Sequence, residues 1–157
     1  MGQISMEKSV LPGSVLSGNQ HKHRSKMMAR ASDAFRTISR GAYISLVAQP
    51  GNDGDVLVAI AGDGSSKVAP ELSKGARFQL YLALRIAGYH EFVATRRPVP
   101  FIADDIMETF DDDRSAEAIG LFAEIAQLGQ VIYMTHHRHL CDLAQKVCPS
   151  VKIHKLD

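Results

Sequence analysis

The sequence predicts an α/β domain with a parallel sheet within residues 99–154 and an antiparallel hairpin within residues 43–61. The parallel sheet is predicted because apolar runs that start at Val99 and Val131 flank an amphipathic stretch. Strand, helix, strand is typical of a parallel crossover unit. The hairpin is predicted because two apolar runs flank the turn sequence at residues 51–54, Gly-Asn-Asp-Gly.

Length and composition indicate one globular domain. The chain has 157 residues, of which 45% are hydrophobic and 22% are charged, so wholesale disorder is excluded. A net charge of +1 gives no general argument for a nucleic-acid or membrane partner. No apolar run approaches the roughly 18 residues that span a membrane. Residues 1–30 lack the apolar stretch of a signal peptide, so we expect a cytoplasmic protein without a membrane partner.

Residues 1–26 are predicted to form a flexible basic tail, and residues 27–157 the folded domain. Glycine, proline and serine interrupt any helical period in the tail, and residues 21–26 are polar and basic. Residues 1–30 hold five Lys or Arg and one Glu. A basic arm that contacts nucleic acid is therefore an alternative, and charge is its only support.

The remaining elements follow from the spacing of apolar residues. Recurrence at intervals of three and four is typical of helices, and Gly41 is placed to cap the first of them. A final edge strand is predicted at residues 151–154. The predicted helices are residues 26–38, 73–90, 113–128 and 139–147.

Two carboxylates, Asp104 and Asp105, follow directly after an apolar strand. Ligands of open α/β sheets bind at the carboxyl ends of the strands. Two adjacent acids are costly there unless a cation is near, so Mg²⁺ or a polarised water is the natural partner. The alternative is a solvated acidic loop in which residues 111–113 stabilise a helix N-terminus.

Two further polar features lie at the ends of predicted elements. Ser73 and Gly75 begin a long helix, where a hydroxyl and free backbone N–H groups can bind an anion. A plain N-cap at Ser73 is the alternative. Thr135 and His136 end an apolar strand, where a histidine can hydrogen-bond a phosphate or a water, or can be satisfied within the fold.

Together these motifs resemble those of ABC-type ATPases, and they are closest to the SMC-like, YhaN-like branch of AAA family ATPases. This branch holds DNA-metabolism proteins with coiled coils, so the resemblance implies a P-loop NTPase fold and a role in DNA maintenance such as repair. The likeness lies in the signature motif at 72–76, the Walker B strand at 101–105, the D-loop at Phe110-Asp111 and the switch histidine at His136.

The resemblance implies a nucleotide site shared between two heads that sandwich ATP. Ser73, Lys74 and Gly75 of the signature would contact a nucleotide held by another subunit, and Asp111 would cross the dimer interface. Chemistry of this kind depends on positioning and charge neutralisation.

In the nucleotide site of this chain's own head, the resemblance assigns three roles. Asp104 would hold Mg²⁺ through water, Asp105 would polarise the attacking water as a general base, and His136 would sense the γ-phosphate. Asp105 stands where many ABC ATPases have Glu. A double Asp resembles the YhaN-like branch, so we do not expect this difference to abolish activity.

The sequence contains no Gly-x-x-x-x-Gly-Lys-Ser/Thr phosphate loop. We therefore expect it to correspond to the C-terminal half of a head. ATP hydrolysis would then require an N-terminal ATPase lobe, or a full-length head, supplied in trans. A second copy of the chain and DNA are further candidate partners. Isolation from the N-terminal lobe should leave an apolar sheet edge or face exposed.

An alternative function concerns the chain as a whole. The chain is alternatively a truncated, non-catalytic remnant or a protein-interaction module without nucleotide binding of its own.

A metal site is a further interpretation of the residues after the second apolar strand. His136, His137, His139 and Cys141 are close in sequence, but their spacing matches no zinc pattern, and we expect no metal site from that segment.

Overall fold

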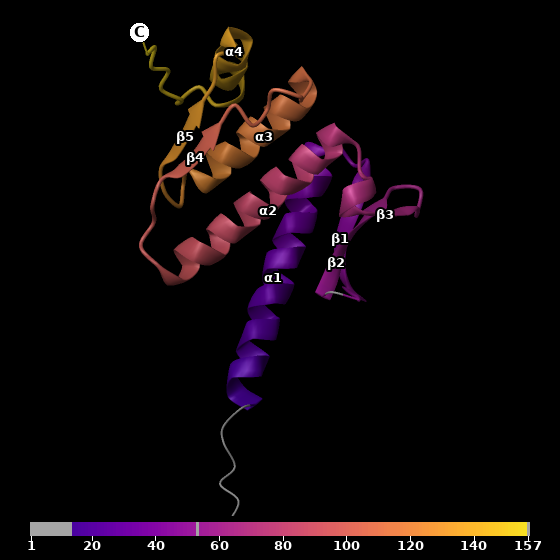
Figure 1. Ribbon diagram of the computed structural model, residues 1–157. Coiled ribbons are helices and arrows are strands. Elements are labelled where there is room, and N and C mark those ends of the chain that lie inside the picture. The colour runs from indigo at the N-terminus through magenta and orange to yellow at the C-terminus, as the bar shows by residue number, and fades with distance from the viewer. Residues whose placement is uncertain (1–13, 53, 157) are drawn as a thin grey trace, which may run out of the picture.

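The computed structural model describes residues 14–52 and 54–156, which form two small sheets with helices between them (Figure 1). This is the α/β class that the sequence predicts. The helices are α1 (Ser14–Ile38), η1 (Ala69–Glu71, a 3-10 turn), α2 (Lys74–Thr95), α3 (Asp112–Ile125) and α4 (Arg138–Val147). The strands are β1 (Tyr43–Gly51), β2 (Gly54–Ala61), β3 (Ser66–Val68), β4 (Phe101–Asp104) and β5 (Val131–Met134).

Strands β4 and β5 pair in parallel, and α3 is the crossover between them, as predicted. Phe101 lies opposite Val131, and Asp104 lies opposite Met134. The prediction of a strand at residues 151–154 is wrong, because these residues have no regular secondary structure. The backbone N–H of Val151 instead donates to the carbonyl of Cys148 in a turn.

The predicted hairpin is confirmed: β1 and β2 pair antiparallel, with Gly51 opposite Gly54 at the turn. Gly54 has a φ of +125°, which only glycine adopts at low cost. The predicted helix end at Gly41 is confirmed as well. Its φ is +79°, and its N–H donates to the carbonyl of Arg36 at 2.9 Å.

Helix α1 begins well before the predicted start at Lys26. Residues 14–26, which we expected in the tail, are helical instead, and residues 1–13 lie outside the described part of the chain. Polar contacts to other elements account for part of this extension. Arg24 forms an ion pair with Asp55 of β2. Apolar periodicity does not reveal a helix segment that is stabilised by polar contacts.

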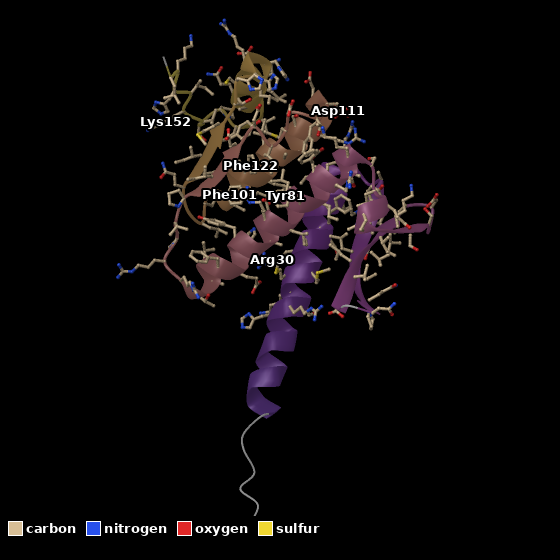
Figure 2. The ribbon with its side chains drawn as sticks, in the orientation of Figure 1. Arg30, Tyr81, Phe101, Asp111, Phe122 and Lys152 are labelled. Atoms are coloured by element: carbon tan, nitrogen blue, oxygen red, sulfur yellow. The ribbon has the colours of Figure 1, made fainter. Side chains whose placement is uncertain are left out.

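One buried core joins both sheets through the helices. In Figure 1, α1 and α2 cross in the centre, with β1–β3 on one side and α3 with β4 and β5 on the other. Aromatic contacts extend the core under the parallel strands. Phe101 packs edge-on against Tyr89. It also packs tilted against Phe122, and Figure 2 labels these two phenylalanines. The largest fully buried apolar side chains are Phe35, Ile38, Leu82, Met107 and Ile125.

No element within residues 14–52 and 54–156 covers one face of the parallel pair. Side chains alternate along both strands, so Phe101 and Ala103 are buried, whereas Ile102, Ile132 and Met134 are exposed. The expected exposed apolar sheet face is therefore confirmed.

Candidate functional site

Asp104 and Asp105 separate at the end of β4. Asp104 continues the strand alternation and lies on the exposed face, opposite Met134. Asp105 leaves the strand with a φ of +45°, a left-handed conformation that Asp tolerates better than most residues. Its N–H still donates to the carbonyl of Met134 at 2.8 Å, so its backbone stays attached to β5. The two acids therefore occupy different environments.

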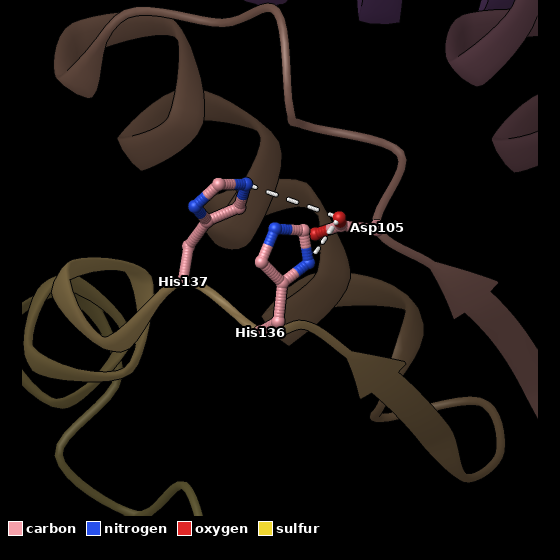
Figure 3. Close-up of side chains that lie close together, drawn as sticks. All are labelled: Asp105, His136 and His137. Carbon is pink, nitrogen blue, oxygen red and sulfur yellow. Dashed lines mark ion pairs between the residues drawn. The ribbon is translucent and has the colours of Figure 1, made fainter.

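Asp105 is brought together with the end of β5, as Figure 3 shows. Nδ1 of His136 lies 2.7 Å from Oδ2 of Asp105. The hydroxyl of Thr135 donates to Oδ1 of the same carboxylate at 2.8 Å. The Asp105 side chain is 23% exposed and that of His136 is 73% exposed, so the carboxylate is half-buried and the imidazole lies open to solvent.

His137 is a third member of this cluster. From the sequence we named it among four closely spaced residues, expected no metal site from them and gave it no role. Its Nε2 lies 3.9 Å from Oδ2 of Asp105 (Figure 3). Its backbone N–H donates to the hydroxyl of Thr135 at 3.1 Å. Strand alternation would point neighbouring histidines in opposite directions, but β5 ends at Met134, before both of them. The sequence signal for this site was the run of polar residues that follows the apolar strand. The convergence of these residues on Asp105 depends on how the backbone turns after Met134.

Tyr133 lies under the cluster, on the buried side of β5. Burial raises the pKa of Tyr133, and the negative charge of Asp105 adds to this effect. The raised pKa keeps the hydroxyl neutral, and it makes no hydrogen bond with the described residues.

Ser73 is the N-cap of α2. Its hydroxyl accepts a hydrogen bond from the N–H of Ala76 at 3.2 Å, which is the plain capping role. Lys74 is exposed, with Nζ 5.9 Å from the ring centroid of Phe78. A Cβ added at Gly75 would meet open space. Within the described residues, no hydrogen bond or ion pair joins this segment to Asp105.

Asp111 is the N-cap of α3 and lies at the exposed end of that helix (Figure 2). Its Oδ1 accepts a hydrogen bond from the N–H of Arg114 at 2.8 Å, and the two side chains form an ion pair. The backbone hydrogen bond from Arg114, together with the Arg114 charge, lowers the pKa of Asp111. The carboxylate is therefore ionised and stabilises the helix N-terminus.

The basic segment of α1 is partly neutralised within the chain. Arg24 pairs with Asp55, and Nε of Arg30 lies 3.8 Å from Glu91 of α2. Their charges are therefore directed to other elements of the fold, which weakens the argument that this segment is a nucleic-acid arm.

No family model matches the sequence. Several SMC heads resemble the structure. A chain from a structure on ATP-driven dimerization and DNA-stimulated activation of SMC ATPases matches with a TM-score of 0.66 and 18% identity, over 82% of this chain and 77% of that one. An SMC head bound to the C-winged helix domain of ScpA matches with a TM-score of 0.67 and 18% identity, over 82% and 40% of the two chains. This chain has an SMC head fold.

The SMC head fold belongs to the P-loop NTPase folds, as the sequence motifs led us to expect. A third SMC head, from Pyrococcus yayanosii with a coiled coil and joint, matches with a TM-score of 0.66 and 18% identity, over 83% and 25% of the chains. Among curated proteins, the uncharacterized protein YhaN of Bacillus subtilis (strain 168) is 29% identical over 121 residues. That match covers 74% of this chain but only 12% of YhaN.

Among the residues that the structure describes, no helix combines the length and the apolar character needed to cross a bilayer.

Proposed function

We propose that this chain is the C-terminal lobe of an SMC-like ATPase head and contributes to a composite site for ATP binding and hydrolysis. The observation that carries the proposal is the 2.7 Å approach of Asp105 and His136 at the carboxyl ends of two paired parallel strands. This edge is the ligand-binding edge of open α/β sheets, and the chain has an SMC head fold.

Asp105 is proposed as the general base. Thr135 holds Oδ1, which leaves Oδ2 as the oxygen that accepts a proton from the attacking water. In the free chain Oδ2 is paired with His136. Because the His136 side chain is 73% exposed, its ring is free to turn toward a γ-phosphate and thereby release Oδ2 for water. The histidine would thus couple phosphate binding to activation of the base.

Asp104 is proposed as the Mg²⁺ residue. Its carboxylate is exposed and has no hydrogen bond or ion pair with the described residues, so it fits an ion that is bound through one carboxylate, water and phosphate oxygens. Bound Mg²⁺ supplies charge neutralisation at the phosphate. Asp104 would orient this ion, while Asp105 remains available for the water.

The start of α2 is proposed as the signature that completes a site in another head. Ser73, Lys74 and the backbone of Gly75 lie at a helix N-terminus, where partial positive charge favours a phosphate. Space beside Gly75 permits close approach of another surface. Asp111 is proposed to cross the interface between heads because it lies exposed at the end of α3.

The main partner is proposed to be an N-terminal lobe that supplies the phosphate loop. On the edge of β4 that faces away from β5, the Ile102 carbonyl already accepts a hydrogen bond from Arg85 of α2 at 2.9 Å. No described strand pairs with the outer edge of β5. An added strand at β5 would also help to cover Ile132 and Met134. Self-association and DNA binding are further proposals, and the likeness to the YhaN-like branch supports a role in DNA maintenance.

Reconstituted ATP hydrolysis tests the proposal. The full chain is mixed with the N-terminal lobe of a YhaN-like protein, and Mg²⁺-dependent phosphate release is measured. We expect activity only in the mixture, and a loss of about 10²-fold or more in Asp105→Asn. His139→Ala is the matched control, since it removes a nearby exposed histidine outside the site. Undiminished hydrolysis in Asp105→Asn, or none with any N-terminal lobe that binds the chain, would contradict the proposal.

A protein-interaction module without nucleotide binding is the second candidate. The exposed apolar face of β4 and β5 favours it, as does the lack of a phosphate loop in the sequence. Calorimetric titration of the mixture with Mg-ATP separates the two functions. A stable complex of both lobes that binds no nucleotide would support the module and contradict the ATPase.

A further inference from the structure

Three potential metal ligands converge where β4 and β5 end. Oδ2 of Asp105 lies 2.7 Å from Nδ1 of His136 and 3.9 Å from Nε2 of His137 (Figure 3). The three ligand atoms all lie within 4.8 Å of one another. Tetrahedral ligands about 2.1 Å from an ion are about 3.4 Å apart, so small side-chain rotations would bring these three atoms around one centre.

We propose that Asp105, His136 and His137 form a binding site for a divalent transition-metal ion of the Zn²⁺ class. Two imidazole nitrogens and one carboxylate oxygen suit Zn²⁺ and its neighbours in the first transition row. Mg²⁺ prefers oxygen ligands, so this site differs in chemistry from the one proposed at Asp104. The inference does not depend on the proposed ATPase function.

Thr135 arranges the site before any ion arrives. Its hydroxyl donates to Oδ1 of Asp105 and accepts from the N–H of His137, which fixes one ligand side chain and the backbone of another. The remaining carboxylate oxygen, Oδ2, is left facing the histidines. Hydrogen bonds of this kind orient metal ligands and strengthen binding.

The histidine side chains provide one shielded ligand and one accessible ligand. Nε2 of His137 is buried and makes no hydrogen bond with the described residues, so it is a nitrogen without a satisfied partner. The ring centroids of His136 and His137 are 3.9 Å apart, and the His136 side chain is 73% exposed. An ion could therefore enter from the His136 side and keep water in its open positions.

Occupancy of the site would have a consequence for the proposed hydrolysis. The ion would hold Asp105 and His136, the two residues to which we assign the base and the phosphate sensor. The ion would therefore inhibit ATP hydrolysis, because Asp105 and His136 cannot bind it and act on water and phosphate at the same time. This consequence rests on the proposed function, whereas binding of the ion does not.

Calorimetric titration of the metal-stripped full chain with Zn²⁺, without nucleotide or partner, tests binding alone. We expect one high-affinity ion per chain, and visible absorption typical of nitrogen and oxygen ligation when Co²⁺ replaces Zn²⁺. His137→Ala and Asp105→Asn should each weaken binding at least about tenfold. His139→Ala is the control, because its imidazole is 4.0 Å from Asp112 and outside the three-residue cluster.

Circular dichroism of each variant checks that the fold is retained. His137 makes no side-chain cap hydrogen bond at the start of α4, so we expect His137→Ala to fold normally. Failure of the chain to bind Zn²⁺ saturably would overturn the proposal. So would equal affinity in the wild type and in His137→Ala. Because these readouts require no ATP, their failure is distinguishable from failure of the ATPase proposal.

Discussion

The hydroxyl of Thr135 donates to Oδ1 of Asp105 at 2.8 Å and so joins the ends of two strands that are far apart in the sequence. Its oxygen also accepts the N–H of His137. One side chain therefore sets the position of the acid and the direction of the chain after β5. The candidate site depends on this contact as much as on the charged residues.

Thr135→Val should destabilise the domain. The change keeps the side-chain shape but removes the hydroxyl, which leaves the partly buried Asp105 oxygen and the His137 N–H without their partner. We expect a loss of about 1–2 kcal/mol in the free energy of unfolding, measured by urea denaturation. Thr135→Ser keeps the hydroxyl and should retain most of the stability. A larger loss in Thr135→Ser than in Thr135→Val would indicate that methyl packing matters more than the hydrogen bonds.

Ser73 allows capping to be separated from a signature role. Ser73→Ala removes the acceptor for the Ala76 N–H and should lower the free energy of unfolding by about 1 kcal/mol. Ser73→Asn retains capping and should be close to wild type in urea denaturation. If Ser73 also contacts a phosphate across two heads, Ser73→Asn should lower hydrolysis in the reconstituted assembly. Full activity of this stable variant would leave capping as the sole role.

Asp111 should make the stability of α3 depend on pH. Its folded-state pKa lies below the ordinary 3.8, so the ionised cap stabilises the fold above pH 3.8, and this contribution is lost as pH falls through the lowered pKa. Asp111→Ala should cost about 1 kcal/mol in urea denaturation at pH 7, with the cost shrinking below pH 3.8. Glu117→Ala, in the middle of the same helix, is the control and should show a smaller cost. A cost for Asp111→Ala that grows on acidification would contradict the assignment.

Two glycines should respond in opposite directions to the same substitution. A Cβ at Gly129 would clash with the Tyr89 hydroxyl, which is held by the carbonyl of Val99 at 2.8 Å. Gly129→Ala should therefore lower the free energy of unfolding by about 1–3 kcal/mol. A Cβ at Gly120, inside α3, would meet nothing within 4 Å, so Gly120→Ala should raise it by about 0.5–1 kcal/mol. Thermal melts of the two variants should shift in opposite directions.

The exposed face of the parallel strands should cause self-association of the lone chain. Ile102 and Ile132 are 49% and 37% exposed and lie opposite each other in the strand pairing. Replacing both with Ser should weaken association at least about tenfold, because burial of one such side chain is worth about 1.5–3 kcal/mol. Sedimentation velocity over a concentration series measures this. Leu156→Ser, at an exposed residue outside the sheet, is the control, and equal effects of both changes would argue against the face.

Local patterns predicted most elements of this fold. The turn at residues 51–54 and the apolar runs beside it were sufficient for the hairpin, and apolar spacing located α2, α3 and α4. The N-terminal half of α1 was missed because the helix there carries polar contacts, such as Arg24 to Asp55, rather than an apolar stripe. The predicted strand at residues 151–154 failed because its apolar residues do not pair with β4 or β5.

The sequence by itself determined that polar residues stand at the ends of two parallel strands, because side-chain type and strand order are local properties. Only the tertiary structure decided which of them meet. Parallel pairing places Asp105 beside residues 30 positions later, and its positive φ turns it away from Asp104 toward Thr135 and His136. The end of β5 at Met134 lets His136 and His137 face one carboxylate. Such convergence depends on backbone geometry after the strands, which residue spacing alone does not specify.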